Sequence, residues 1–165
     1  MKVSASVRLA ILGSTLLIGT GGLFAQSGST SKSICMSTGS STPEAIGDRD
    51  GHFVQVSTST CRIEGGPLDG GVMTQNSIWE MDKANANLTS GNGVVRMAGG
   101  VAIYQTTGGS RTLIIKDGKV AGWTASGKSV FVTGAGSAAA VAGKPFSWTA
   151  RLTGLNQYTI DTVMD

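Results

Sequence analysis

Residues 111–132 read RTLIIKDGKVAGWTASGKSVFV, and their pattern is the clearest indication of the fold class. Two runs rich in β-branched residues flank Asp117-Gly118, a pair that suits the positive φ needed at both central positions of a type I′ hairpin turn. Neither run has the i, i+3, i+4 spacing of apolar residues that an amphipathic helix requires. The stretch therefore predicts two antiparallel strands, 111–116 and 119–132, joined by a tight turn.

The same pattern extends over the rest of the chain, which is rich in Thr, Ser, Val and Gly. Alternating runs stand between turn signals, and Gly108-Gly109 is interpreted as a further two-residue hairpin turn. The predicted strands cover residues 32–38, 52–64, 72–81, 87–97, 100–107, 111–116, 119–132, 145–153 and 156–163. Residues 134–143, almost all small, predict a short helix or a packed loop. Eight or nine antiparallel strands with short links predict an all-β, up-and-down barrel, with a β-sandwich as the alternative.

The first 25 residues have the features of a secretory signal peptide. Lys2 and Arg8 stand beside an apolar stretch, residues 9–19, and Ala25 is a small residue suited to the position before a cleavage site. Residues 26–31 are rich in Ser and Gly and are expected to form a flexible tail, which leaves 32–165 as a single domain. The sequence thus predicts a bacterial protein that is periplasmic or secreted, with no transmembrane segment after cleavage.

The charge of the chain excludes some classes of partner. It has 165 residues, with 13 basic and 10 acidic side chains and a net charge of +3. Loss of Lys2 and Arg8 with the signal peptide takes two cations from this balance and leaves +1. No basic run could neutralise a row of phosphates, so we expect no binding to nucleic acid.

Cys35 and Cys61 are the two cysteines of the chain. An exported protein folds in an oxidising compartment, where two cysteines form one pair. A reactive thiol or a metal-binding pair would need a helper group, and His52, the one histidine, is not adjacent in sequence. We therefore expect a structural disulfide that connects the first predicted strand to the second.

Two glycine-rich strings match nucleotide-binding motifs by letter. Gly122–Ser129 fits the phosphate-binding loop pattern, but a strand pattern follows it where that motif needs the N-terminus of a helix. Gly134–Ala139 resembles the opening of a dinucleotide-binding unit, but only 26 residues follow Ala139 and they predict two strands. Neither string predicts a nucleotide partner, and the sequence predicts no cofactor.

Polar residues that could carry out catalysis or bind metal are few. Asp48 and His52 could face the same way, but their spacing matches no standard metal-binding loop, so no metal site is predicted. One histidine and the absence of a G-x-S-x-G string argue against a Ser-His-Asp hydrolase. Glu64 and Glu80 lie near the ends of neighbouring predicted strands, where a buried carboxylate could act as an acid or a base.

Large aromatic residues occur at alternating positions of several predicted strands. Six of them would share one interior if the sheet closes: Trp79, Tyr104, Trp123, Phe131, Trp148 and Tyr158. They form either an ordinary core or the lining of an apolar cavity. Four are the candidate ligand-binding residues: Trp79, Tyr104, Trp123 and Trp148.

The segment from about residue 72 to residue 163 resembles small β-barrels of the allene oxide cyclase and dirigent-like superfamily. The resemblance rests on glycine-punctuated strands, SGNGVV at 90–95 and GKSVFVTGA at 127–135. It implies an eight-stranded barrel whose cavity binds or guides an apolar or phenolic small molecule, and it places no catalytic residue on this chain. Avidin-like and lipocalin-like barrels are the neighbouring alternatives.

These observations leave three hypotheses for function. The first is an exported barrel that binds a small hydrophobic or phenolic molecule in its interior. The second is a structural or interaction protein of the cell envelope without enzymatic activity. The third is an isomerase or cyclase that uses a carboxylate at the mouth of the barrel. The sequence leaves open whether the protein is an enzyme and what its oligomeric state is.

Overall fold

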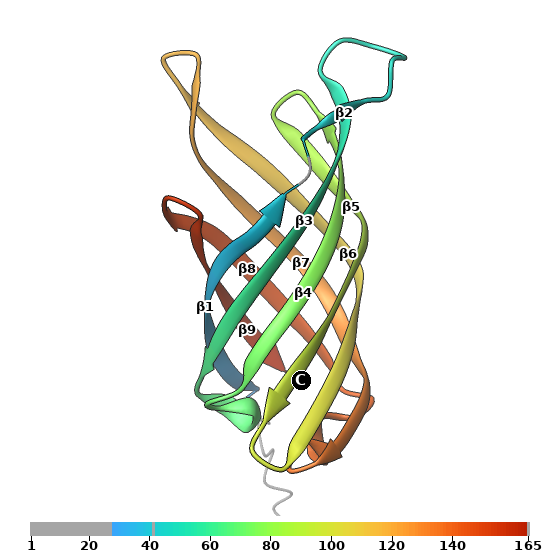
Figure 1. Cartoon of the computed structure of the whole chain (residues 1–165), viewed down its shortest axis with the longest axis vertical. Coiled ribbons are helices and arrows are strands. Elements are labelled where there is room, and N and C mark those ends of the chain that lie inside the picture. The colour runs from blue at the N-terminus through green and yellow to red at the C-terminus, as the bar shows by residue number, and fades with distance from the viewer. Residues whose placement is uncertain (1–27, 41, 165) are drawn as a thin grey trace, which may run out of the picture.

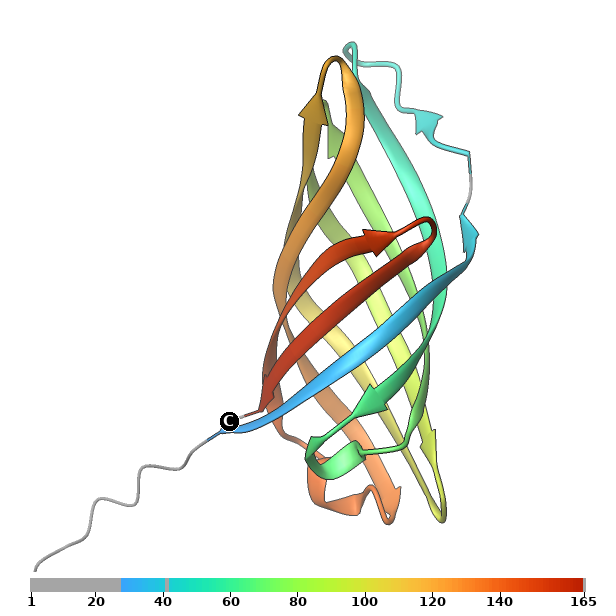
Figure 2. The same cartoon turned by 90° about the vertical axis from the view of Figure 1, so that its left-hand side faces the viewer.

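The chain folds as a closed, eight-stranded antiparallel β-barrel with one additional short strand (Figures 1 and 2). This computed structural model describes residues 28–40 and 42–164. The predicted all-β, up-and-down barrel is confirmed, and the β-sandwich alternative is wrong because the sheet closes on itself. The predicted signal peptide, residues 1–25, lies outside the described residues.

The wall strands follow the order of the chain around the ring, which closes where the last strand pairs with the first. The wall strands are β1 (Ser29–Ser40), β3 (His52–Glu64), β4 (Val72–Asp82), β5 (Asn85–Met97), β6 (Gly100–Lys116), β7 (Lys119–Gly136), β8 (Pro145–Gly154) and β9 (Gln157–Met164). Strands β3 to β9 form a meander in which each strand pairs with the next. Strand β1 lies between β9 and β3 and closes the ring. The short strand β2 (Glu44–Ala45) pairs with the start of β3 outside the ring.

The turn between β6 and β7 forms where the sequence predicts it. Asp117 and Gly118 have φ angles of 49° and 70°, the left-handed values that a type I′ turn requires at both positions. Lys116 and Lys119 are register partners on either side of the turn. The local chemistry of this dipeptide therefore sets the register of the two longest strands.

The predicted hairpin turn at Gly108-Gly109 is wrong. Strand β6 runs through both glycines without interruption, and the two predicted strands 100–107 and 111–116 are one strand. A Cβ atom on Gly109 would lie 3.0 Å from Cζ2 of Trp148, and one on Gly127 would lie 2.4 Å from the same atom. These two glycines make space for the indole ring inside the barrel. The register shift between Thr106 and Gly108 is a bulge that bends the wall there.

Two further predictions need adjustment. Strand β1 begins at Ser29, so residues 29–31 belong to the barrel wall and not to the predicted flexible tail. Residues 134–143 contain the end of β7 and a 3-10 turn, η2 (Ala139–Val141), whose Val141 is buried, so this segment is a packed connection. A second 3-10 turn, η1 (Gly66–Leu68), connects β3 to β4 at the same end of the barrel (Figure 1).

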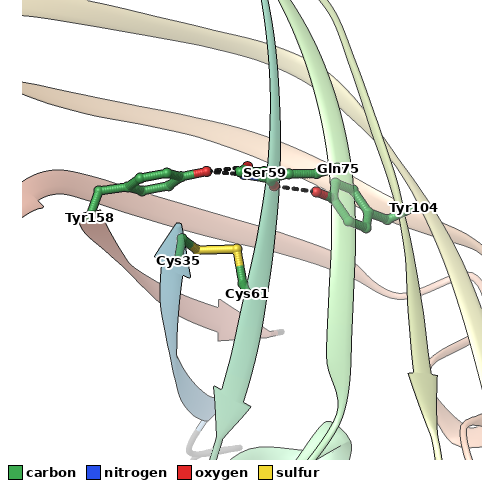
Figure 3. Close-up of a disulfide and its surroundings, with 6 residues drawn as sticks. All are labelled: Cys35, Ser59, Cys61, Gln75, Tyr104 and Tyr158. Carbon is green, nitrogen blue, oxygen red and sulfur yellow. Dashed lines mark hydrogen bonds between the residues drawn. A yellow bond between two sulfur atoms is a disulfide. The ribbon is translucent and has the colours of Figure 1, made fainter. Parts of the chain in front are cut away.

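The predicted disulfide is confirmed. Cys35 and Cys61 are direct register partners on β1 and β3, and both side chains point into the barrel, where they are almost fully buried (Figure 3). Strands β1 and β3 are consecutive strands of the wall, and the connection between them contains β2. The disulfide thus ties strand β1 covalently to its neighbour β3.

No helix within residues 28–40 and 42–164 is both long enough and apolar enough to cross a membrane.

Candidate functional site

A cavity of about 470 Å³ lies inside the barrel. This volume falls in the range of roughly 300–1,000 Å³ that is typical of small-molecule pockets. All six aromatic side chains that were expected to share one interior line it: Trp79, Tyr104, Trp123, Phe131, Trp148 and Tyr158. The chain has three tryptophans, and all of them line this cavity, so tryptophan fluorescence is sensitive to what occupies it.

The two ends of the barrel differ in how they bound the cavity. Leu68, in η1, and Met164, at the end of β9, line it and are almost fully buried, so this end is filled. At the other end Leu155 and Asn156, in the β8–β9 turn, line the cavity, and Leu155 is 94% exposed. In Figure 2 this turn stops well short of the tip of the β6–β7 hairpin, so the wall is lower there. The cavity therefore opens beside the β8–β9 turn.

A row of polar side chains crosses the interior from wall to wall. Ser59 on β3 pairs in register with Gln75 on β4, Gln75 with Gly93 on β5, and Gly93 with Tyr104 on β6. A Cβ atom on Gly93 would lie 2.5–2.7 Å from atoms of the Tyr104 ring. The missing side chain lets the phenol lie across β5, and Tyr104 donates a hydrogen bond of 2.6 Å to Oε1 of Gln75.

Tyr158 completes this row from the opposite wall (Figure 3). The amide nitrogen of Gln75 donates to the Tyr158 oxygen at 2.6 Å and to the Ser59 oxygen at 3.0 Å, and the two hydroxyls share a hydrogen bond of 2.5 Å. Burial raises the pKa of both Tyr104 and Tyr158, so both phenols stay protonated at neutral pH. We call these four residues, Ser59, Gln75, Tyr104 and Tyr158, the polar row.

Two of the three indole N–H groups in the cavity have protein partners. Trp79 donates to Ser77 at 3.0 Å, and Trp148 donates to Ser129 at 3.1 Å. Ser129 in turn donates to Thr106 at 3.1 Å. These bonds fix the two rings in place, since a buried N–H group without a partner is costly.

Arg111 on β6 is the functional candidate that the sequence reasoning missed. Its guanidinium carbon lies 4.1 Å from the centre of the Trp79 ring system and 5.8 Å from that of Trp123. Burial lowers the pKa of Arg111 to about 10, so the group is still charged at neutral pH. The signal was present in the sequence, because Arg111 and Leu113 stand two residues apart and therefore share a face of the strand.

Arg111 also has an unusual hydrogen-bonding state. Three buried side-chain nitrogen or oxygen atoms have no hydrogen-bond partner in the described part of the chain, and two of them are Nε and Nη2 of Arg111. Among the described residues that line the cavity, Arg111 is the one charged side chain. The cavity thus combines an apolar aromatic lining with a single cation whose N–H groups are unused.

The two carboxylates considered as catalytic groups do not line the cavity. Glu64 accepts a hydrogen bond from Arg62. The residues of β3 that line the cavity are at odd-numbered positions, so Glu64 lies on the opposite face of the strand. Glu80 accepts from Nε2 of His52 at a distance of 2.8 Å. Both carboxylates therefore have partners elsewhere, and their places give no support to the cyclase hypothesis.

His52 is held by two carboxylates near the start of β3. Its Nδ1 lies 2.5 Å from Oδ1 of Asp48, and its Nε2 contacts Glu80. These hydrogen bonds raise the pKa of His52, and the bond to His52 lowers the pKa of Asp48. Within the described ranges, no group of three or more His, Cys, Asp and Glu side chains could hold a metal ion. The cluster fastens the connection between β1 and β3 to β4.

Comparison with known proteins finds no family model that matches the chain and no curated protein that is similar to it. The closed eight-stranded barrel is the fold implied by the resemblance to allene oxide cyclase and dirigent-like barrels. Membership of that superfamily stays a prediction. The two nucleotide-motif strings fall on β7 and on the segment that follows it, and Gly122–Ser129 lies wholly within that strand.

Proposed function

We propose that this protein binds a small hydrophobic or phenolic molecule inside its barrel. The observation that carries this proposal is the cavity of about 470 Å³, lined by all three tryptophans and open beside the β8–β9 turn. Aromatic walls favour apolar ligands because they remove a large apolar area from water without exposing unpaired polar groups. The hydroxyls and the amide of the polar row offer partners for one polar group on such a ligand.

The proposal includes export to the periplasm or the cell exterior. The buried disulfide between Cys35 and Cys61 supports it, because disulfides persist in oxidising compartments. The signal-like segment of residues 1–25 supports it from the sequence. A carrier or sensor of lipophilic compounds in such a compartment needs a solvent-exposed entrance and an apolar lining, and both features are described above.

A neutral fluorescent probe tests the proposal without assuming any charge on the ligand. N-phenyl-1-naphthylamine gains emission in an apolar site, and its absorption allows energy transfer from tryptophan. We expect saturable binding with an equimolar endpoint, together with loss of tryptophan emission. A flat titration would overturn the proposal and would favour the envelope-interaction hypothesis.

A pair of variants locates the bound probe. Ala125 and Thr124 are neighbours on β7, but Ala125 lines the cavity whereas Thr124 is exposed. We expect Ala125→Phe to weaken probe binding at least tenfold, because the new ring occupies the lumen. Thr124→Phe adds the same ring outside and should leave the affinity within twofold. If Ala125→Phe does not fold, Ser57→Leu adds a smaller group to the same cavity. Equal binding by the lumen and control variants would place the probe outside the barrel.

A further inference from the structure

The arginines on the outer surface form ion pairs or hydrogen bonds with other side chains. Arg49 pairs with Asp48 and Asp82, Arg62 with Glu64, and Arg151 with Asp161. Arg96 donates to Thr74. Among the arginines in the described ranges, Arg111 alone donates no side-chain hydrogen bond. It is also the one that lines the cavity.

The two unused atoms of Arg111 belong to one edge of the guanidinium. Nε and Nη2 carry parallel N–H bonds in the plane of the group, spaced to meet the two oxygens of a carboxylate. Arg49 uses the same edge on the surface, where its Nε and Nη2 lie 3.1 Å and 2.9 Å from Oδ2 of Asp82. The vacant edge of Arg111 is therefore the one that this chain uses elsewhere to bind a carboxylate.

This edge of Arg111 is buried, and its aromatic neighbours form no hydrogen bond with it. A guanidinium stacked against an indole is attracted through its flat face, so the contact with Trp79 does not consume any N–H group. The register partners of Arg111 on β5 and β7 are Ala86 and Ala125, whose methyl groups offer it neither a hydrogen-bond acceptor nor a counter-charge. Leu113, two residues further along β6, adds apolar surface to the same part of the cavity.

A buried cation without a counter-charge is unfavourable, and no acidic side chain is among the described residues that line the cavity. A ligand with an anionic group would supply that charge and also satisfy the two N–H groups. A neutral ligand could at most offer these groups a hydrogen-bond acceptor and would leave the positive charge unbalanced. The charge and the N–H groups of Arg111 are therefore complementary to an anionic group on a ligand.

We infer that the ligand is an amphipathic monocarboxylic acid, whose carboxylate pairs with Nε and Nη2 of Arg111 between Trp79 and Trp123 while its apolar body fills the aromatic cavity. This inference rests on the proposed function, because it names the chemical class of the bound molecule. The acid could have a flexible alkyl chain or a flat aromatic body, and both share the carboxylate on which the recognition depends.

Matched pairs of compounds test the inference by displacement of N-phenyl-1-naphthylamine from the full-length mature protein. Decanoate is compared with 1-decanol, and 2-naphthoate with 2-naphthol, so that each pair differs in its polar group. We expect at least one acid to bind about tenfold or more tightly than its alcohol, in line with a charged hydrogen bond inside a protein. The pair with the larger difference indicates an alkyl or an aromatic body.

Arginine variants then assign the effect to one side chain. Arg111→Met should reduce the affinity for the acid about tenfold or more and leave that for the alcohol within threefold. Arg111→Lys keeps a positive charge but loses the planar edge, so it should retain only part of the preference. Arg151→Gln removes an exposed guanidinium and serves as the matched control. Probe binding by each variant shows that its barrel is intact.

The outcomes separate the two proposals. Equal affinity for acid and alcohol, or an acid preference that survives in Arg111→Met, would overturn the carboxylate inference while cavity binding stands. Failure of the probe and of all four compounds to bind would overturn the proposed function and the inference with it. An acid preference lost in Arg111→Met and kept in Arg151→Gln supports both.

Discussion

Replacement of Gly93 by alanine should destabilise the barrel through a single side chain, Tyr104. The new methyl group would lie 2.5 Å from Cε1 and 2.7 Å from Cζ and the hydroxyl oxygen of Tyr104. The ring cannot swing away freely, because its centre lies 6.1 Å from that of Phe131 and 5.7 Å from that of Phe146. It must move by several tenths of an ångström or more, which breaks its hydrogen bond to Gln75.

The cost can be worked from these contacts. Overpacking a filled core costs about 1–3 kcal/mol, and a buried acceptor that loses its donor costs about 1–3 kcal/mol. Replacing glycine by alanine returns about 0.4–1 kcal/mol by restricting the unfolded chain. We therefore expect Gly93→Ala to lower the free energy of unfolding by about 2–4 kcal/mol.

Urea denaturation of the oxidised protein measures this change. Gly108→Ala is the matched control, because Gly108 also lies in a strand, has no positive φ and has no atom within 4 Å of the point where an added methyl group would lie. It should change the free energy of unfolding by less than about 0.5 kcal/mol. A Gly93→Ala variant as stable as Gly108→Ala would show that Tyr104 does not need the space left by Gly93.

Three further outcomes are expected from denaturation of variants. Removal of the disulfide in Cys35→Ala/Cys61→Ala should cost about 3.5 kcal/mol by the chain-entropy relation for a separation of 26 residues; a loss below about 1 kcal/mol would contradict it. The folded-state pKa of His52 is raised and that of Asp48 is lowered. Wild type should therefore be more stable than His52→Gln at pH values above the pKa of Asp48 and below that of His52, where both groups are charged. This advantage is full below the unfolded pKa of about 6.5 and should vanish as the pH rises through the folded pKa of His52; an advantage that grows with pH would have the wrong sign. Arg111→Met should raise the free energy of unfolding in the absence of ligand by about 1–2 kcal/mol, since replacing a buried charge by an apolar group of similar size is often stabilising. A loss of more than about 1 kcal/mol would show that stacking on the indoles outweighs the burial of the charge.

Local sequence chemistry predicted most of the wall of the barrel. Strand β3 has the predicted bounds, and the Asp117-Gly118 turn forms as its residues require. The glycine pair at 108–109 misled the prediction because a glycine in a strand has two different causes. It either permits a turn or gives space to a ring from another strand, and the position of Trp148 that separates these causes depends on tertiary register.

The site was predictable in its aromatic part and not in its polar part. Alternation places Trp79, Tyr104, Trp123 and Trp148 on the inner face of any closed sheet. An arginine in the same pattern is ordinarily expected to face solvent, so the sequence alone does not predict that Arg111 lines the cavity. The polar row depends on which residues of β3, β4 and β6 lie opposite one another, and alternation along one strand contains no information about that register.

Register also brings the two ends of the barrel's chain together. Ser29, the first residue of β1, is paired with Met164, the last of β9, and paired residues on antiparallel strands lie only about 5 Å apart at their Cα atoms. A short linker between them would replace the one wall junction that no loop or covalent bond spans. New ends could then be opened at the Asp117-Gly118 turn, far from the pairing of β1 with β9. Such a circular permutant keeps every strand neighbour of the barrel while it changes the order in which the strands leave the ribosome.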